Sequence, residues 1–234
     1  MGGMSKTVSK ALQQLGLLIA LAPPAGAAPP PQDTLAQRLQ ACTVCHGAEG
    51  RATASGYHPR LAGKPADYLY QQLLAFRDGR RHSPVMAELM APLSDAYLRE
   101  IASHFATLDL PYPAPARPAA TPEQLRRGEQ LVRRGDPTRG LPACAACHGE
   151  RLGGRLPALP GLLGLPPDYL LAQLGAWRNG QRQAQAPDCM AQLARRLAPE
   201  DVAAVARWIA HQPVPAGLRP EAPAPLPEPC GAQP

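Results

Sequence analysis

Apolar residues recur at helical spacing near the end of each half of the chain. Each of two segments places apolar side chains at positions i, i+3 and i+7, which is typical of a helix that buries one face. These residues are Leu98, Ile101 and Phe105 in the first segment and Val202, Val205 and Ile209 in the second. No stretch alternates between apolar and polar residues as a half-buried strand does. The pattern therefore predicts an all-α fold.

Capping residues, prolines and glycines set the bounds of the predicted helices. Thr121 is a good N-cap and Pro122 suits a first helical position, whereas Gly79 and Gly180 are typical stops. The predicted helices run from Thr34 to Cys45, from about Pro65 to Asp78 and from Ser94 onward in the first half, and from Pro122 to about Arg134, from Pro167 to Asn179 and from Pro199 onward in the second. Each half shows the same outline.

The second half of the chain repeats the first at an offset of 101 positions. Pro59–Gly63 corresponds to Pro160–Gly164, and Asp67–Leu69 corresponds to Asp168–Leu170. The same offset pairs aromatic residues that we expect to form core walls. They are Tyr68 with Tyr169 and Phe76 with Trp177. Two copies of one module are therefore present.

The repeat also predicts how the chain divides. We expect a signal peptide at residues 1–27, a first domain at 28–110, a linker at 111–120, a second domain at 121–212 and a tail at 213–234. The linker and the tail are rich in proline. We expect the linker to be extended and stiff, and the tail to be disordered or to lie on the surface, outside any core.

The N-terminal segment has the three parts of a secretory signal. Lys6 and Lys10 precede the apolar run Leu15–Ala22, and Ala25–Ala27 provides small residues for cleavage. The apolar run is too short to span a membrane. We expect an exported, periplasmic protein that is monomeric and either soluble or loosely associated with a membrane. The alternative is an uncleaved N-terminal anchor.

A motif of the form Cys-x-x-Cys-His occurs once in each half. Two thiols at this spacing can add to the two vinyl groups of one porphyrin, and the adjacent histidine then reaches the iron as an axial ligand. A zinc site or a thiol redox pair also uses Cys-x-x-Cys, but neither needs the following histidine in both copies. We therefore predict two covalently bound haem c groups. The predicted attachment residues are Cys42, Cys45, Cys144 and Cys147, and the predicted iron ligands are His46 and His148.

Methionine is the usual second axial ligand of a haem that carries electrons. After residue 27 the chain holds three methionines, Met86, Met90 and Met190. Met86 lies seven residues before Leu93, and Met190 lies seven residues before Leu197, each at the same point before the last helix of its half. Met86 and Met190 are therefore the predicted distal ligands. Met90 is interpreted as a core or surface thioether.

Four histidines have no counterpart in the other half, and a lone histidine is more often a surface or core residue than a ligand. They are His58, His82, His104 and His211. His82 is an alternative to Met86 as the distal ligand, and it would give the first haem a lower potential.

Pro59 and Pro160 occupy equivalent positions after the two haem motifs. A backbone carbonyl at such a position would accept a hydrogen bond from the proximal imidazole and orient it. The alternative is that both residues are ordinary turn prolines.

Cys189 and Cys230 remain once the haems take four of the six cysteines. In an oxidising compartment a disulfide between them would attach the tail to the second half. Two unpaired thiols are the alternative. A third possibility is that Cys189 binds iron, although the alignment of the two halves favours its neighbour Met190.

The positive charge of the chain does not indicate a nucleic-acid partner. The formal net charge of +6 includes Lys6 and Lys10 of the signal segment. Four haem propionates would bring the rest of the chain close to neutrality. The basic surplus lies mostly in the second half, where it would steer an acidic docking partner. The low aromatic content of 4% also suits an interior filled partly by porphyrin.

A set of motifs spread over roughly residues 33 to 212 resembles the cytochrome c4 family, two-haem periplasmic cytochromes built from tandem class I cytochrome c domains. The residues that carry the resemblance are Cys42–Gly47, Pro59–Gly63, Tyr68–Leu69, Gln72–Leu73, Phe76–Gly79, Met86 and Leu93–Asp95, with Gly140–Gly149 and Met190 in the second half. The resemblance implies two all-α domains about a pseudo-twofold axis, each with a few short helices around a His-Met haem. It further implies electron transfer from a quinol-oxidising complex to a terminal oxidase. The second half departs from the pattern, since its segment from Tyr169 to Met190 is three residues longer than the corresponding segment of the first.

Three functions are compatible with two such sites. The leading interpretation is a periplasmic electron carrier that is not an enzyme. The second is the cytochrome subunit of a periplasmic dehydrogenase, such as a flavoprotein that oxidises sulfide. The third is a two-haem enzyme acting on thiosulfate or peroxide, which would need an open or cysteine-ligated iron, whereas the two methionines favour filled coordination.

Overall fold

The computed structural model describes residues 34–53, 56–113 and 117–231, and the chain divides into two units, residues 1–37 and 38–234. In the described part of the first unit, the N–H of Gln37 donates to Thr34 Oγ1 at 3.3 Å and closes the start of a helix. The predicted signal peptide lies outside the described residues. None of the helices within the described ranges is long and apolar enough to cross a membrane.

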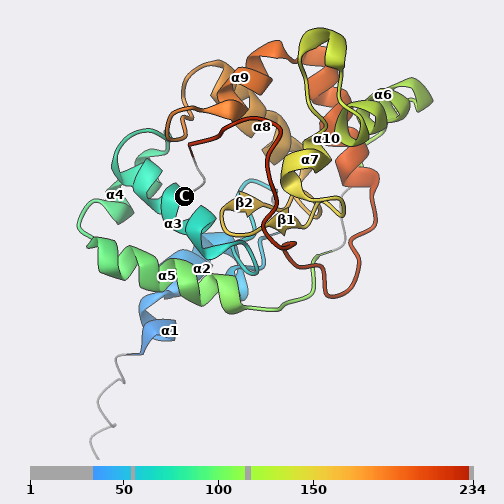
Figure 1. Cartoon of the computed structure of the whole chain (residues 1–234). Coiled ribbons are helices and arrows are strands. Elements are labelled where there is room, and N and C mark those ends of the chain that lie inside the picture. Colours follow the sequence, from blue (N-terminus) through green and yellow to red (C-terminus); the bar gives the residue numbers. More distant parts are fainter. Residues whose placement is uncertain (1–33, 54–55, 114–116, 232–234) are drawn as a thin grey trace, which may run out of the picture. The chain divides into compact units, whose positions relative to one another are not determined.

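The first half of the repeat is helical, and its predicted helices are present with altered bounds (Figure 1). Its elements are α1 (Leu35–Arg38), α2 (Gln40–His46), the 3-10 helix η1 (Ala48–Gly50), α3 (Ala66–Arg77), α4 (Pro84–Met90) and α5 (Asp95–Thr107). The single helix predicted from Thr34 to Cys45 is divided at Leu39, whose side chain is buried. Helix α4 is not among the predicted helices.

The second half follows the same order of main helices. Its elements are α6 (Pro122–Arg133), the 3-10 helix η2 (Pro137–Arg139), α7 (Cys144–His148), β1 (Gly154–Arg155), β2 (Leu159–Pro160), α8 (Pro167–Arg178), α9 (Cys189–Arg196) and α10 (Pro199–His211). The all-α prediction is confirmed apart from β1 and β2, which pair antiparallel with Gly154 opposite Pro160. Each strand has two residues, too few for an alternating pattern to show in the sequence.

Helix α6 begins at the predicted cap and crosses α10 closely. Thr121 Oγ1 accepts the N–H of Gln124 at 3.2 Å, and the Gln124 side chain accepts the N–H of Thr121 at 3.0 Å. A Cβ atom at Gly128 would lie 2.3 Å from the carbonyl oxygen of Ala204 and 2.5 Å from Cβ of Trp208. The two helices therefore approach closely only because residue 128 is glycine.

Each half buries apolar side chains between equivalent helices. In the first half α3 packs against α4 and α5, and in the second α8 packs against α9 and α10. Both predicted apolar stripes, on α5 and α10, are buried, which confirms them. The buried residues include Leu39, Leu69, Phe76, Leu98 and Phe105 in the first half and Leu131, Val132, Leu152, Tyr169 and Ile209 in the second.

The two halves contact each other through a short antiparallel bridge centred on Arg81 and Arg182, which are equivalent positions of the repeat. The N–H of His82 donates to the carbonyl of Gln181 at 2.8 Å, and a reciprocal bond of 2.7 Å returns from the second half. Reciprocal contacts between equivalent residues are typical of an arrangement about a twofold axis. The domain boundaries at residues 110 and 121 stay predictions.

The proline-rich tail is ordered along the second half, as the dark red segment in Figure 1 shows. Leu218 is only 8% exposed and joins the core of that half. Further along, the N–H of Glu221 donates to the carbonyl of Gly154 at 2.9 Å. The expectation that the tail lies outside any core is therefore wrong at Leu218, because burial of this apolar side chain in the core is favourable.

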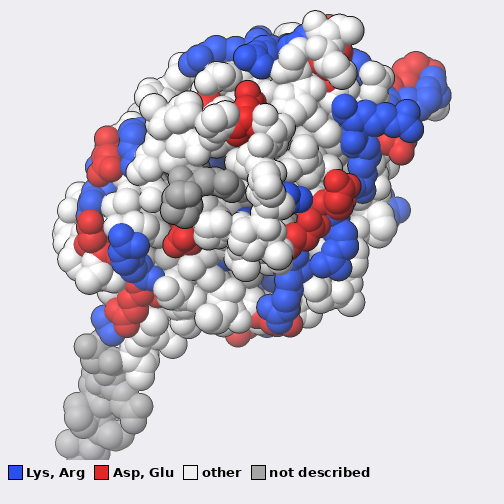
Figure 2. Space-filling model, viewed as in Figure 1, with Lys and Arg blue, Asp and Glu red and all other residues white. Residues whose placement is uncertain are grey.

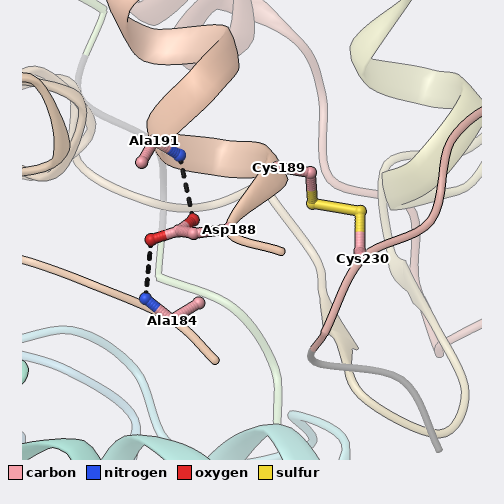
Figure 3. Close-up of a disulfide and its surroundings, with 5 residues drawn as sticks. All are labelled: Ala184, Asp188, Cys189, Ala191 and Cys230. Atoms are coloured by element: carbon pink, nitrogen blue, oxygen red, sulfur yellow. Dashed lines mark hydrogen bonds between the residues drawn. A yellow bond between two sulfur atoms is a disulfide. The ribbon is translucent and has the colours of Figure 1, made fainter. Parts of the chain in front are cut away.

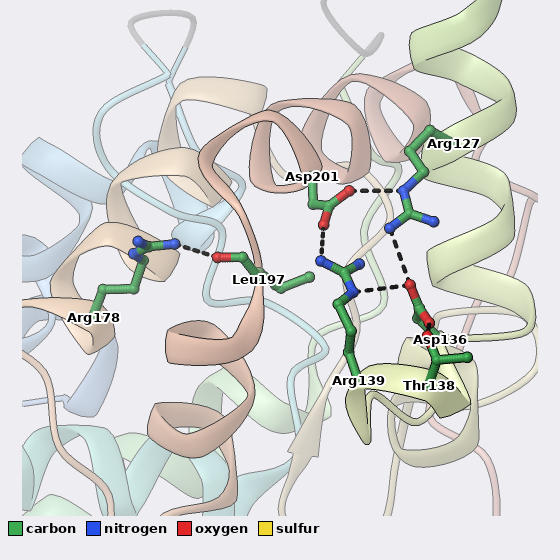
Figure 4. Close-up of polar contacts among 7 residues, drawn as sticks. All are labelled: Arg127, Asp136, Thr138, Arg139, Arg178, Leu197 and Asp201. Atoms are coloured by element: carbon green, nitrogen blue, oxygen red, sulfur yellow. Dashed lines mark hydrogen bonds and ion pairs between the residues drawn. The ribbon is translucent and has the colours of Figure 1, made fainter.

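A network of four charged side chains joins α6, η2 and α10 (Figure 4). Arg127 contacts Asp201 at 2.7 Å and Asp136 at 3.2 Å, and Arg139 contacts the same two carboxylates at 2.7 and 2.9 Å. Hydrogen bonds from Thr138 and from both guanidiniums lower the pKa of Asp136 to about 2. The network fixes the segment that leads into the second cysteine motif.

Basic and acidic side chains are interspersed along the margin of the face shown in Figure 2, and the centre of that face is largely uncharged. The basic surplus expected in the second half therefore does not form a continuous basic surface on this face.

Candidate haem sites

The two motif histidines are buried and held in the same way. His46 ends α2, and its Nδ1 lies 2.9 Å from the carbonyl oxygen of Pro59. His148 ends α7, and its Nδ1 lies 2.8 Å from the carbonyl oxygen of Pro160. Burial lowers the pKa of both imidazoles. A neutral ring that donates from Nδ1 leaves the lone pair of Nε2 free for a metal.

The four motif cysteines are free thiols placed within one helical turn of these histidines. None of Cys42, Cys45, Cys144 and Cys147 takes part in a disulfide. Burial raises the pKa of Cys144 to about 11, so its thiol stays protonated. Attachment of a porphyrin through thioether bonds requires cysteines that are free in this way.

A zinc site built from both motifs has no counterpart in the structure. Within residues 34–53, 56–113 and 117–231, no three side chains of His, Cys, Asp or Glu gather as a metal site would require. The two motifs instead lie in different helices, α2 and α7, each with its own histidine. This arrangement fits one haem at each motif.

The predicted distal methionines lie at the start of two equivalent helices. Met86 is in the first turn of α4, Met190 is in the first turn of α9, and both side chains are partly buried. Met90 is only 4% exposed and lies in the core of the first half. Helices α4 and α9 pack against α3 and α8 respectively, so the two methionines are placed by equivalent pairs of helices.

The unmatched histidines differ in their surroundings. His58 lies against the motif histidine of the first half, with its ring centroid 5.6 Å from that of His46. His82 is exposed and donates its backbone N–H across the bridge between the halves. His211 lies with its Nδ1 2.8 Å from the carbonyl oxygen of Arg207. Among these histidines, His58 is the one that lies beside a predicted site, and no repeat position marks it.

Cys189 and Cys230 form a disulfide with a Cα–Cα distance of 5.5 Å (Figure 3). Beside it, Asp188 caps helix α9 by accepting the N–H of Ala191 at 2.9 Å. A sulfur in a disulfide has no thiolate to offer to iron. The bond therefore leaves Met190 as the sulfur ligand available in this segment.

Two buried guanidiniums lie between the halves with neutral hydrogen-bond partners. Arg81 donates to Tyr169 at 2.9 Å and Arg182 donates to Tyr68 at 3.3 Å, while Gln72 and Gln173 accept from both. Arg81 is 8% and Arg182 is 5% exposed.

In the described part of the chain neither of these guanidiniums pairs with a carboxylate. Two buried like charges are costly without a counter-ion. A haem brings two propionate carboxylates with it, so this cluster fits a chain that holds haem. The sequence contains one indication of this arginine pair, because Arg81 and Arg182 match at the repeat offset.

This chain is similar to known cytochromes in sequence and in fold. The family model described as cytochrome C oxidase, cbb3-type, subunit III, matches residues 123–209. The structure of reduced recombinant cytochrome c4 from Pseudomonas stutzeri superposes with a TM-score of 0.65 and 30% identity, over 75% of this chain and 95% of that chain. The chain belongs to the cytochrome c4 family.

Two relatives of this cytochrome c4-like chain carry another name. A thiosulfate dehydrogenase electron acceptor of Thiomonas intermedia is 38% identical over 80% of this chain and 82% of its own length. The structure of thiosulfate dehydrogenase from Marichromatium purpuratum matches with a TM-score of 0.66 and 34% identity, over 74% of this chain. This chain spans 36% of that protein's length.

Membership of the cytochrome c4 family confirms several predictions at once. The fold consists of two tandem class I cytochrome c domains, the cofactors are two haem c groups, and the protein carries electrons. Each haem iron takes up or releases one electron. The residues that attach and ligate the two groups stay predictions.

Proposed function

We propose that this two-haem cytochrome accepts electrons in the periplasm from a thiosulfate-oxidising dehydrogenase and delivers them to the respiratory chain. One observation carries the proposal: identity to the named thiosulfate dehydrogenase electron acceptor is 38%, against 33 and 34% to two curated relatives named cytochrome c4. Export by the signal at residues 1–27 would place the chain in the same compartment as such a partner.

The ligand set that supports this function is the one predicted from the repeat. Thioether bonds form at Cys42 and Cys45 for the first haem and at Cys144 and Cys147 for the second. The iron ligands are His46 with Met86, and His148 with Met190. The hydrogen bonds to Pro59 and Pro160, at 2.9 and 2.8 Å, support a proximal role for both histidines.

The stoichiometry of the reaction suits two one-electron sites. When two thiosulfate ions join through a new sulfur–sulfur bond, two electrons leave and tetrathionate forms. One chain can store both electrons, one in each half. The donor binds and oxidises thiosulfate, so this chain needs no substrate pocket of its own.

Membership of the cytochrome c4 family favours a second candidate, a shuttle from a quinol-oxidising complex to a terminal oxidase. A subunit role beside a sulfide-oxidising flavoprotein is a weaker alternative with no supporting relative among those compared above. An enzyme role is weaker still, because the disulfide occupies Cys189 and the proposed methionines fill both irons.

The test compares two electron donors for the same oxidised holoprotein. A purified thiosulfate dehydrogenase with thiosulfate should reduce both haems, with one tetrathionate formed per chain reduced. A purified quinol-oxidising complex with its quinol should reduce the chain at least about tenfold more slowly, which corresponds to about 1.4 kcal/mol in the activation barrier. The reverse order of rates would favour the quinol shuttle and overturn the proposal. Thiosulfate alone is the control.

A further inference from the structure

The tail contacts the chain that follows the second haem motif through Glu221. Glu221 Oε1 accepts the N–H of Arg151 at 3.0 Å, and the Glu221 carbonyl accepts the N–H of Leu156 at 2.9 Å. A Cβ atom at Gly149, the residue after His148, would lie 2.8 Å from Cδ of Glu221. Glu221 therefore sits directly beside the end of the second haem motif.

The middle of the tail is packed against the protein at Glu228. The Oε1 atom of Glu228 is buried and has no hydrogen-bond partner in the described part of the chain. Burial raises the pKa of the Cys147 thiol, and the charge of Glu228 raises that pKa further.

The end of the tail is fixed beside the proposed distal ligand. Cys230 is bonded to Cys189, the residue before Met190 (Figure 3). The next residue, Gly231, donates its N–H to the carbonyl of Pro187 at 2.9 Å. Residues 221–230, named the C-terminal strap below, thus run from the neighbourhood of His148 to that of Met190.

Two axial ligands lie on opposite faces of one haem, so a segment that connects their surroundings must cross an edge of that haem. We infer that the C-terminal strap covers the edge of the second haem at Cys147, and that electron donors exchange electrons with this protein at the first haem, beside Val44. The inference rests on the proposed pairing of His148 with Met190.

The first half differs from the second at the equivalent place. Val44 lies between the two motif cysteines and is 81% exposed, whereas its counterpart Ala146 is half-buried. Beside Met86, the side chain of Val85 is also exposed. Among the described residues, the chain beyond α5 leads into the linker and the second half and provides no second strap. The first edge is therefore the accessible one.

The inferred route conserves electrons. A one-electron donor loses one electron, which enters beside Val44 and then crosses between the halves. A second electron follows by the same entrance. Both electrons leave the donor, and no further reductant is required.

The test introduces a charged side chain at Val44 or at Ala146 and measures how fast an inorganic donor reduces the protein. The donor, hexaammineruthenium(II), needs no protein partner. Val44→Glu should raise, and Val44→Lys should lower, the second-order rate constant of reduction by about two- to five-fold at low ionic strength, because the donor is a cation. The matched variants Ala146→Glu and Ala146→Lys should leave the rate constant nearly unchanged. High salt should abolish the difference at Val44.

Release of the strap completes the test. In the C189S/C230S variant, charges at position 146 should change the rate constant as charges at position 44 do. If C189S/C230S does not retain both haems, a C189S chain that ends at Glu221 replaces it, since this chain keeps Leu218 and Glu221 in place.

Two results would overturn the inference. One is an effect of Ala146→Glu and Ala146→Lys in the intact chain equal to that at Val44, and the other is no effect at position 146 after release. The absorption spectrum of each variant shows separately whether both irons keep methionine ligation. Because the donor is inorganic, a failure of the thiosulfate proposal would leave these outcomes unaffected.

Discussion

The ammonium of Lys64 donates a 2.6 Å hydrogen bond to the carbonyl oxygen of Gly161. Lys64 belongs to the first half, is only 4% exposed, and occupies the repeat position of Leu165 in the second. Gly161 follows Pro160, whose carbonyl holds His148. The second haem site thus contains a cation from the other half, and the two sites differ electrostatically despite the repeat.

Replacement of Lys64 should shift the potential of the second haem only. A unit charge about 10 Å away at an effective dielectric constant of about 20 contributes about 1.7 kcal/mol, on the order of 70 mV for one electron. Because a nearby cation favours the reduced iron, Lys64→Met should lower the potential of the second haem and leave the first nearly unchanged. A potentiometric titration at pH 6 measures both, since burial lowers the pKa of Lys64 to about 7 and the ammonium is charged there.

Leu165→Met provides the control for Lys64→Met, because it changes shape at the equivalent position without changing charge. Equal shifts of both potentials in Lys64→Met would show that the charge acts on the whole molecule instead of on the second site.

The methionine assignments make opposite predictions for the proposed ligands and for Met90. Met86→Ala and Met190→Ala should each remove half of the absorption typical of methionine-ligated haem and allow one equivalent of carbon monoxide to bind quickly after reduction. Met90→Ala should keep the spectrum but lower the free energy of unfolding by about 2 to 5 kcal/mol, because Met90 is buried in the core. Rapid carbon monoxide binding by Met90→Ala would contradict the assignment. His82→Ala should change neither the absorption spectrum nor the binding of carbon monoxide.

Local sequence patterns that occur in both halves predict the longer helices. Helices α3, α5, α8 and α10 are long. A glycine stop follows α3 and α8, and an apolar stripe marks α5 and α10, so local pattern is sufficient to find them. Helices α4 and α9 have seven and eight residues, too short to be stable by themselves. They form because they pack against α3 and α8, which a local pattern does not reveal.

The burial of three basic side chains was not predicted from the sequence. Lysine and arginine are expected on the surface, so neither Lys64 nor the pair Arg81 and Arg182 was predicted to be buried. The arginine pair could have been found, because it recurs at the repeat offset. Lys64 could not, since its counterpart is Leu165 and its partner Gly161 lies in the other half.

Two helical glycines should respond in opposite directions to alanine. At Gly128, an added Cβ would lie 2.3 Å from the carbonyl oxygen of Ala204, so Gly128→Ala must separate α6 from α10 and should cost about 3 kcal/mol or more. At Gly175 in α8, no atom lies within 4 Å of an added Cβ, and Gly175→Ala should stabilise by about 0.5 to 1 kcal/mol. Urea denaturation of the two holoproteins measures both changes. A stabilising Gly128→Ala would show that the helices cross less closely than described.

Acid should weaken the second half through Asp136. Hydrogen bonds from Thr138, Arg127 and Arg139 lower its pKa from 3.8 to about 2, so the folded state binds a proton less readily than the unfolded chain. The corresponding stability is fully present above about pH 4 and is lost as the pH falls from 4 towards 2.

Asp136→Asn should therefore unfold at a lower urea concentration than the wild type at pH 7, and the two midpoints should converge as the pH approaches 2. Glu129→Gln, which removes one acidic charge from the exposed face of the same region, should give no such convergence. A constant gap between Asp136→Asn and the wild type over this range would mean that shape at position 136, and not its charge, stabilises the segment.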